Sequence, residues 1–261
     1  MLFELEWMGG TAERLFQAHR GDGIDVIPWD TVGVGLSDVE RDRLRTVWTQ
    51  SSHQEWCAAG AFSALLTALL EARAPVDLVG MAGRFVADEM VHVELTARMA
   101  NAYGGGVPLE VEPHARPVDD GLDDAVERAC ALAVRVSCVG ESFSLPLIAS
   151  ELARSTDPVT RAVLVRIAAD EAPHATVGWL VLDWALPRLD ARAVERLERV
   201  ADDAVAALLP ALRADPANRA LYGHVLETRI RRPLESRGVH LAPTGWPGNR
   251  EEGGVRESTA G

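Results

Sequence analysis

Positive charge is scarce in this chain of 261 residues. Its 26 Lys and Arg residues face 39 Asp and Glu residues, which gives a formal net charge of −13. This balance argues against the basic surface by which proteins attract nucleic acids and anionic membranes. We therefore expect no nucleic-acid partner and no membrane partner.

Cysteines and long apolar runs are also few. The three cysteines, Cys57, Cys130 and Cys138, are odd in number and form no Cys-x-x-Cys pair, as expected for a reduced protein. The longest uncharged run, 56–70, has 15 residues, which is short for a membrane span. The first ten residues, "MLFELEWMGG", carry acids where a secretory signal carries bases. The sequence therefore predicts a cytoplasmic location.

Strand patterns are missing as well, and helical periodicity dominates. The short alternating stretch "VPLEVEP" is bounded by prolines, which disfavour a central strand. Ser37 with Glu40 reads as a capping box, and Asp157-Pro158 reads as an N-cap and first helical residue. We expect an all-α fold in which a helical domain, 37–242, follows an irregular arm, 1–36, and precedes a disordered tail, 243–261. The predicted helices are 38–72, 76–103, 122–155 and 158–189, with extra C-terminal helices at 191–213 and 217–231.

An internal repeat stands inside these helices. The second helix carries "DEMVH" at 88–92 and the fourth carries "DEAPH" at 170–174, and both read D-E-x-x-H. An upstream glutamate precedes each motif inside an apolar helix. Glu55 lies 34 residues before Glu89, and Glu141 lies 30 residues before Glu171.

Helix geometry brings the repeated residues together. Residues i and i+3 lie on one face of a helix, so Glu89 projects with His92, and Glu171 with His174. If the third and fourth helices form an antiparallel hairpin, Glu141 lies level with Glu171. The pattern thus predicts carboxylates and imidazoles that converge between helices.

The connection between the second and third helices completes a recognisable topology. The 18 residues 104–121 can span roughly 60 Å when extended, enough to cross a bundle from end to end. Over about 37–189 the chain resembles the ferritin-like di-iron carboxylate proteins, in which two helices each give one Glu and two others each give Glu-x-x-His. The resemblance implies a ferritin-like four-helix bundle with a long crossover between its second and third helices.

The resemblance also implies a ligand set for two metals. Two carboxylates would bridge the metals, and one Glu–His pair would complete each of them. The bridging residues would be Glu89 and Glu171, and the pairs would be Glu55 with His92 and Glu141 with His174. Carboxylate and imidazole ligands without thiolate suit iron or manganese better than structural zinc. Two iron ions are therefore the expected cofactor, with an Mn/Fe pair as an alternative.

A simpler interpretation places some of these glutamates in solvent. One Glu-x-x-His pair on an exposed helix is common, but two with matched upstream glutamates are a much stronger pattern. The apolar residues that share the helical faces of Glu141 and Glu171 also disfavour exposure. Asp88 and Asp170 lie four residues before the histidines and are candidates to orient them. Di-iron monooxygenases often have Arg immediately before each ligand histidine, whereas this chain has Val91 before His92 and Pro173 before His174.

Two prolines lie close to the expected ligands. Pro173 withdraws a hydrogen-bond donor from the carbonyl of Ala169, and Pro146 does the same to Ser142. A proline in a helix interior costs about 3 kcal/mol. We expect these positions to open helical turns beside the metals and make room for a substrate, while a tolerated kink without a role is the alternative.

The function implied by the resemblance is O₂ activation for the oxidation of a small organic substrate. The expected partners are O₂, that substrate and a separate electron donor, since the chain has no rubredoxin-like cysteine pairs; a homodimer is left open. The alternatives are a ferroxidase or iron-storage protein of bacterioferritin type and a non-catalytic metal-binding helical scaffold. No tyrosine stands one turn after either histidine, where Thr96 and Gly178 lie, which argues against a stable tyrosyl radical.

Overall fold

The fold is all-helical throughout the part of the chain that our computed structural model describes, residues 2–111, 121–214 and 219–244. The one pairing of extended segments there is an isolated bridge between Leu2 and Glu110. The longer helical elements, in chain order, are α1 (Gly10–Arg20), α2 (Asp38–Glu71), α3 (Val76–Ala102), α4 (Ala125–Ala133), the π-helical η3 (Val134–Glu141), α5 (Ser142–Arg154), α6 (Pro158–Ala185), α7 (Ala191–Ala214), α8 (Arg219–Val225), the π-helical η6 (Leu226–Arg231) and α9 (Arg232–Glu235).

Local chemistry explains where the long helices begin. Ser37 and Glu40 form both halves of the predicted capping box at the start of α2. The carboxylate of Asp157 accepts from the backbone N–H of Thr160, and Pro158 occupies the first turn of α6. A side-chain oxygen at the N-cap satisfies one of the N–H groups that a helix start leaves unpaired. The predicted helix starts at 38 and 158 are confirmed.

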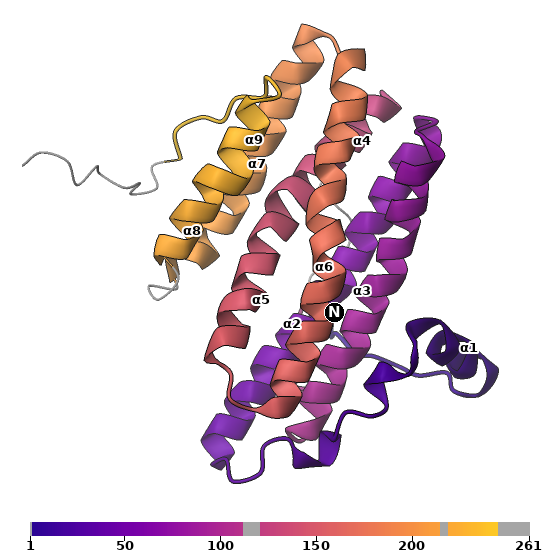
Figure 1. Ribbon diagram of the computed structural model, residues 1–261, viewed down its shortest axis with the longest axis vertical. Helices are drawn as coiled ribbons and strands as arrows, with labels where there is room; N and C mark the ends of the chain where they lie inside the picture. The colour runs from indigo at the N-terminus through magenta and orange to yellow at the C-terminus, as the bar shows by residue number, and fades with distance from the viewer. Residues whose placement is uncertain (1, 112–120, 215–218, 245–261) are drawn as a thin grey trace, which may run out of the picture.

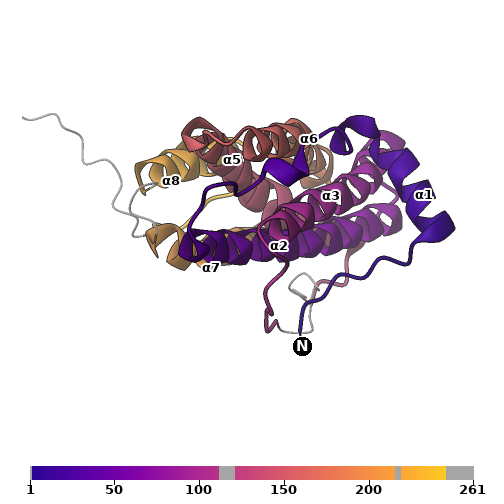
Figure 2. The ribbon, with the colours of Figure 1, turned by 90° about the horizontal axis from the view of Figure 1, so that it is seen from below.

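Four long helical segments lie side by side and enclose the middle of the molecule (Figure 1). The hairpin of α2 and α3 forms one side, and α5 and α6 form the other (Figure 2). The third segment is one continuous helical stretch made of α4, η3 and α5. The connection between α3 and α4 includes residues 112–120, so the predicted crossover lies partly outside the described residues.

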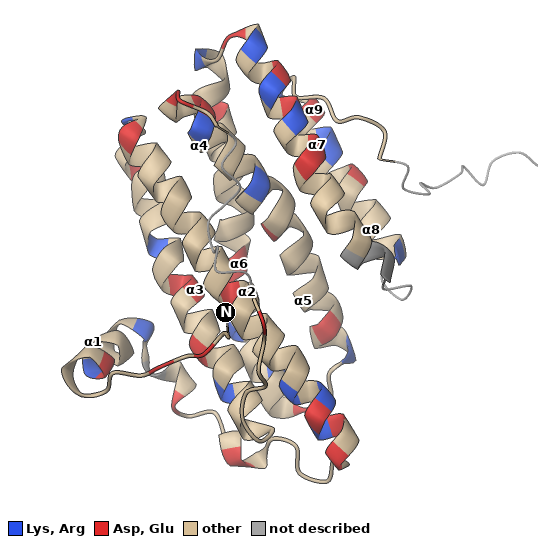
Figure 3. Ribbon diagram, turned by 180° about the vertical axis from the view of Figure 1, so that it is seen from behind, with Lys and Arg blue, Asp and Glu red and all other residues tan. Residues whose placement is uncertain are grey.

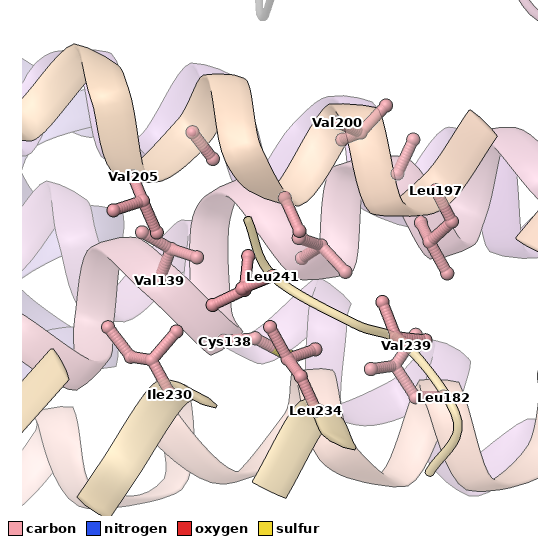
Figure 4. Close-up of a cluster of buried hydrophobic side chains, with 14 of the residues drawn as sticks. Cys138, Val139, Leu182, Leu197, Val200, Val205, Ile230, Leu234, Val239 and Leu241 are labelled. Atoms are coloured by element: carbon pink, nitrogen blue, oxygen red, sulfur yellow. The ribbon is translucent and has the colours of Figure 1, made fainter. Parts of the chain in front are cut away.

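The C-terminal helices cover the third segment. Figure 4 shows that this contact is apolar and that η3 residues face α6, α7 and the final helices. The labelled side chains are Cys138, Val139, Leu182, Leu197, Val200, Val205, Ile230, Leu234, Val239 and Leu241. Arg196 on α7 adds two hydrogen bonds of 2.5 and 2.7 Å to the buried carboxylate of Glu127 on α4. Charges of both signs run along α7, whereas α5 carries them only near its end (Figure 3). An amphipathic α7 therefore keeps its polar face outward.

Three predictions about the elements need correction. The arm is not wholly irregular, because it contains α1, whose last residue, Arg20, is buried and pairs with Glu94 of α3 at 3.0 Å. The third helix includes the π-helical η3, which periodicity did not reveal. The last helical stretch runs to Glu235 rather than 231 and contains the π-helical η6. The predicted disordered tail lies outside the described residues from 245 onward.

One helix has the length and composition of a membrane span. The stretch Ala125–Arg154 reaches a mean hydropathy of 1.4 in its most apolar window. Within the folded chain 56% of that window is buried, against α2, α6 and α7 among others. A core helix of a bundle has the same apolar composition, because it is covered on several sides.

Candidate metal centre

A polar layer interrupts the apolar interior of the bundle. On one side lies a cluster that includes Leu95 and Ile167, and on the other a cluster that includes Phe62, Phe85 and Val177. Polar side chains from α2, α3, η3 and α6 separate the two; five of them are buried, and Glu55 is partly buried. They are the six residues singled out by the repeat: Glu55, Glu89, His92, Glu141, Glu171 and His174. Buried charged groups of this kind need partners or a cation.

Four of these side chains form a compact group of possible ligands. One ligand atom each from Glu55, Glu89, His92 and Glu171 lies within 4.8 Å of the other three. The Nδ1 atom of His92 is 3.3 Å from Glu89, 3.3 Å from Glu171 and 3.8 Å from Glu55. Two ligands about 2.1 Å from a metal and at right angles are roughly 3 Å apart. The spacing is that of atoms able to share a metal ion.

The second histidine repeats this arrangement from the opposite side. The Nδ1 atom of His174 lies 3.0 Å from Oε1 of Glu89 and 3.4 Å from Oε2 of Glu171. The rings of His92 and His174 have centroids 5.9 Å apart. Both Glu89 and Glu171 therefore lie between the two imidazoles, with one oxygen directed to each.

Glu141 joins the group through Glu171. It is the last residue of η3, it is buried, and its carboxyl, whose pKa burial raises, interacts electrostatically with the carboxylates of Glu171 and Glu89, which raise that pKa further. Glu55 differs because it keeps 19% of its side chain exposed. The structure thus brings all six predicted residues together, and it leaves Glu55 as the member closest to solvent.

Asp88 and Asp170 each contact the histidine of the other D-E-x-x-H motif. Oδ2 of Asp170 lies 3.4 Å from Nε2 of His92, and Oδ2 of Asp88 lies 3.6 Å from Nε2 of His174. Each aspartate therefore faces the imidazole of the other motif, not the one that follows it by four residues. A carboxylate at Nε2 favours a proton there and leaves the Nδ1 lone pair for a metal.

Unsatisfied polar atoms support a bound cation at this place. Buried atoms without a hydrogen bond of good geometry include Oε1 of Glu89, Oε2 of Glu171 and both ring nitrogens of His174. Such atoms are rare in folded proteins, because each costs about 1–3 kcal/mol when buried. A metal ion would satisfy the carboxylate oxygens and the Nδ1 atoms together, so the donor set fits.

Proton affinities in the cluster are strongly shifted. Burial raises the pKa of Glu55 to about 7, with His92 opposing and the neighbouring carboxylates reinforcing the rise. Burial together with Glu171 and Glu89 raises the pKa of Glu141 well above its ordinary value. Burial would lower the pKa of His174, but Asp88, Glu171 and Glu89 outweigh it and raise that pKa to about 11. Protons bound here would compete with a metal for the same atoms.

The internal repeat is longer than the motif suggested. Arg84 pairs with Asp88 at 3.2 Å, and Arg166 pairs with Asp170 at 2.8 Å. Each arginine lies four residues before its aspartate, so both helices read R-x-x-x-D-E-x-x-H. Sequence reasoning missed these arginines, although the i, i+4 spacing was visible.

The helical irregularity beside the cluster lies in η3 and not at Pro173. Helix α6 runs unbroken through Pro173, whose side chain is exposed. The eight π-helical residues of η3 end on Glu141, and Pro146 follows within α5. π-helical turns inside α-helices are rare and are frequent at functional sites. The expectation of an opened turn thus finds support next to Glu141 rather than next to His174.

Other polar residues do not join the cluster. Cys138 is fully buried in the apolar contact with the C-terminal helices. His53 contacts the Phe3 ring, with centroids 4.9 Å apart, and lies 3.6 Å from the Cys57 thiol. A cleft of about 320 Å³ opens between α1, α3 and α6, and Asp88 and Arg166 are among its lining residues.

Comparison with known proteins adds no assignment to this geometry. No model of a protein family, no curated protein and no solved structure matches the chain.

Proposed function

We propose that this protein is a ferritin-like di-iron protein that uses O₂ to oxidise a small organic substrate. The observation that carries the proposal is the position of Glu89 and Glu171, each of which lies between the Nδ1 atoms of both buried histidines. Two carboxylates that are shared in this way fit a pair of metal ions better than they fit a single metal ion. The remaining Glu55 and Glu141 would then complete one metal each.

The ligand chemistry favours iron or manganese. Oxygen and imidazole donors without thiolate suit these metals. A reduced di-iron pair, when bound, would supply electrons to O₂. Insertion of one oxygen atom into a substrate C–H bond reduces the other oxygen atom to water and consumes two further electrons and two protons. Those electrons would come from a separate donor protein, because the chain carries no Cys-x-x-Cys pair.

The protein's own residues would hold the reaction in place. Asp170 and Asp88 would fix the tautomer and the ring orientation of His92 and His174. The apolar layers on either side would exclude water, which strengthens electrostatic interactions within the site. Glu55, the partly exposed member, marks the side from which a small molecule or an incoming ion reaches the cluster.

The test is anaerobic loading with Fe²⁺, followed by quantitation of iron and of O₂ consumption. We expect two irons per chain and O₂ consumption that increases with a suitable reductant and organic substrate. Accumulation of hundreds of irons per assembly would instead identify a ferroxidase or storage protein. Two irons without any O₂ consumption would identify a non-catalytic scaffold, and a failure to bind iron would contradict the proposal. Glu171→Ala serves as the metal-deficient control.

A further inference from the structure

A hydroxyl group from a neighbouring helix lies on the backbone of His174. The Oγ of Ser137, in η3, donates to the carbonyl oxygen of His174 at 2.6 Å. The backbone N–H of Gly178 in turn donates to the same Oγ at 2.8 Å. An α-helix ordinarily joins the carbonyl of residue i directly to the N–H of residue i+4. The Ser137 hydroxyl therefore bridges the two ends of the helical turn that begins at His174.

Gly178 makes this approach possible. A Cβ atom at Gly178 would lie 2.7 Å from the Oγ and Cβ of Ser137 and 2.7 Å from the Sγ of Cys138. Side chains cannot approach so closely, so any larger residue would push η3 away from α6. Glycine at position 178, one turn after His174, is thus explained by the close approach of η3.

The other half of the repeat has an equivalent hydroxyl of different origin. Thr96 occupies the position after His92 that Gly178 occupies after His174. Its Oγ1 donates to the carbonyl of His92 at 2.7 Å, with Val93 O at 3.1 Å. Both histidine carbonyls therefore receive a buried O–H donor, one from within the helix and one from a neighbouring helix.

The serine contact also connects the two members of one proposed Glu–His pair. Ser137 lies four residues before Glu141 on the same π-helical segment, and it touches the backbone of His174. In the other half, Ser52 lies three residues before Glu55. Its Oγ donates to the carbonyl of Val93, beside His92, at 3.4 Å. The additional residue between Ser137 and Glu141 is accommodated by the wider turn of η3.

We propose that Ser137 is a positioning residue for His174 and that Thr96 has the same role for His92. A hydroxyl on a helix carbonyl bends the local backbone and so sets the position from which the imidazole extends. Each hydroxyl acts through the backbone of its own histidine. Removing one should therefore disturb one metal position and leave the other intact. This inference rests on the proposed two-metal site.

The test is anaerobic titration with Co²⁺, whose visible absorption reports the geometry of each bound ion. We expect wild-type protein to bind two equivalents. Ser137→Ala and Thr96→Ala should each weaken one equivalent about 10-fold, the lower end of the 10–100-fold effect known for residues that orient metal ligands. Each should also change the absorption of that equivalent only. Thr96→Ser, which keeps the hydroxyl, should restore wild-type behaviour.

Thr176→Ala is the matched control. The Oγ1 of Thr176 donates to the carbonyl oxygen of Ala172 in α6 at 2.9 Å, but Thr176 lies on the exposed face of the helix. Removal of this hydrogen bond should leave the binding of both Co²⁺ equivalents unchanged. If Ser137→Ala does not fold, the variants Thr96→Ala and Thr96→Ser provide the test, because the hydrogen bond from Thr96 to the carbonyl of His92 lies within one helix. Unchanged titrations for both alanine variants would overturn this inference alone. Wild-type protein that binds fewer than two Co²⁺ would overturn the two-metal site and this inference with it.

Discussion

Nε2 of His92 lies 3.4 Å from Oδ2 of Asp170, an aspartate that belongs to the other copy of the D-E-x-x-H motif. The reciprocal pair, His174 with Asp88, is separated by 3.6 Å. The two copies are therefore interlocked: each helix supplies a carboxylate that orients the imidazole of the other. This exchange makes α3 and α6 depend on each other at the level of the cluster.

The crossed contacts predict which residues are coupled energetically. We expect Asp170→Asn to weaken metal binding about 10-fold, because the His92 ring loses its charged partner. In a double-mutant cycle the effect of Asp170→Asn should largely vanish in a His92→Ala background and persist in a His174→Ala background. Metal titration of the three single variants and the two double variants measures this. Coupling to His174 instead would contradict the crossed arrangement.

The shared carboxylates should be essential for metal retention. Glu89→Ala and Glu171→Ala each remove a group that faces both imidazoles, so we expect iron content well below two per chain. Glu151→Ala, which alters an exposed side chain of α5, is the control and should retain the full content. Elemental analysis after gel filtration provides the measurement. Two irons retained in either cluster variant would exclude a shared role for that glutamate.

Removal of metal should destabilise the fold. A ligand that binds only the native state stabilises it by about 2.7 kcal/mol at 100 times its Kd, which corresponds to roughly 5–10 °C in melting temperature for a chain of this size. We therefore expect chelation to lower the melting temperature of the loaded protein by that amount. The same chelator should not change the melting temperature of the Glu171→Ala variant. An unchanged melt after confirmed metal removal is the result that excludes stabilisation by metal.

Metal affinity should rise with pH around neutrality. Because burial raises the pKa of Glu55 to about 7, that carboxyl is protonated below pH 7, and a metal must displace the proton. The contribution of Glu55 to the affinity is therefore fully developed above this pKa and is lost as pH decreases through it. Calorimetric titration at pH 6, 7 and 8 should show proton release that decreases with pH. Glu55→Gln should lack this part of the pH dependence, and a wild-type affinity independent of pH would contradict the argument.

Pro173 offers a test of the helix itself. Replacement by Ala relieves the ring clash and permits a hydrogen bond to Ala169, so we expect a gain of about 1–3 kcal/mol in the free energy of unfolding. Iron content should remain at two, because Glu171 and His174 keep their register. Denaturant unfolding and metal analysis measure both. O₂ consumption by the same variant then distinguishes two roles of the proline. A role in the reaction predicts a decrease in O₂ consumption, whereas a tolerated kink predicts no change. Loss of iron would show that the proline is needed to aim His174.

The sequence by itself determined the helices and the membership of the cluster. Ser37 and Asp157 set the starts of α2 and α6 through side-chain bonds to backbone N–H groups three residues on, and such interactions are local. The i, i+3 spacing placed Glu89 with His92 and Glu171 with His174 for the same reason. The end of α6 was less well predicted, at 189 rather than Ala185, because a short 3₁₀ turn that contains Pro187 follows the helix.

Only the tertiary structure decided how the helices meet. Crossed contacts such as Asp170 with His92 depend on how far α3 and α6 are rotated and displaced relative to each other, and no spacing along one helix encodes that. The hydroxyl of Ser137 reaches His174 because Gly178 permits close approach and because η3 has π-helical geometry. Arg20 finds Glu94 only after the arm folds back onto α3. Local periodicity chooses the face that each helix buries, but the packing of all the helices together selects the atoms that touch.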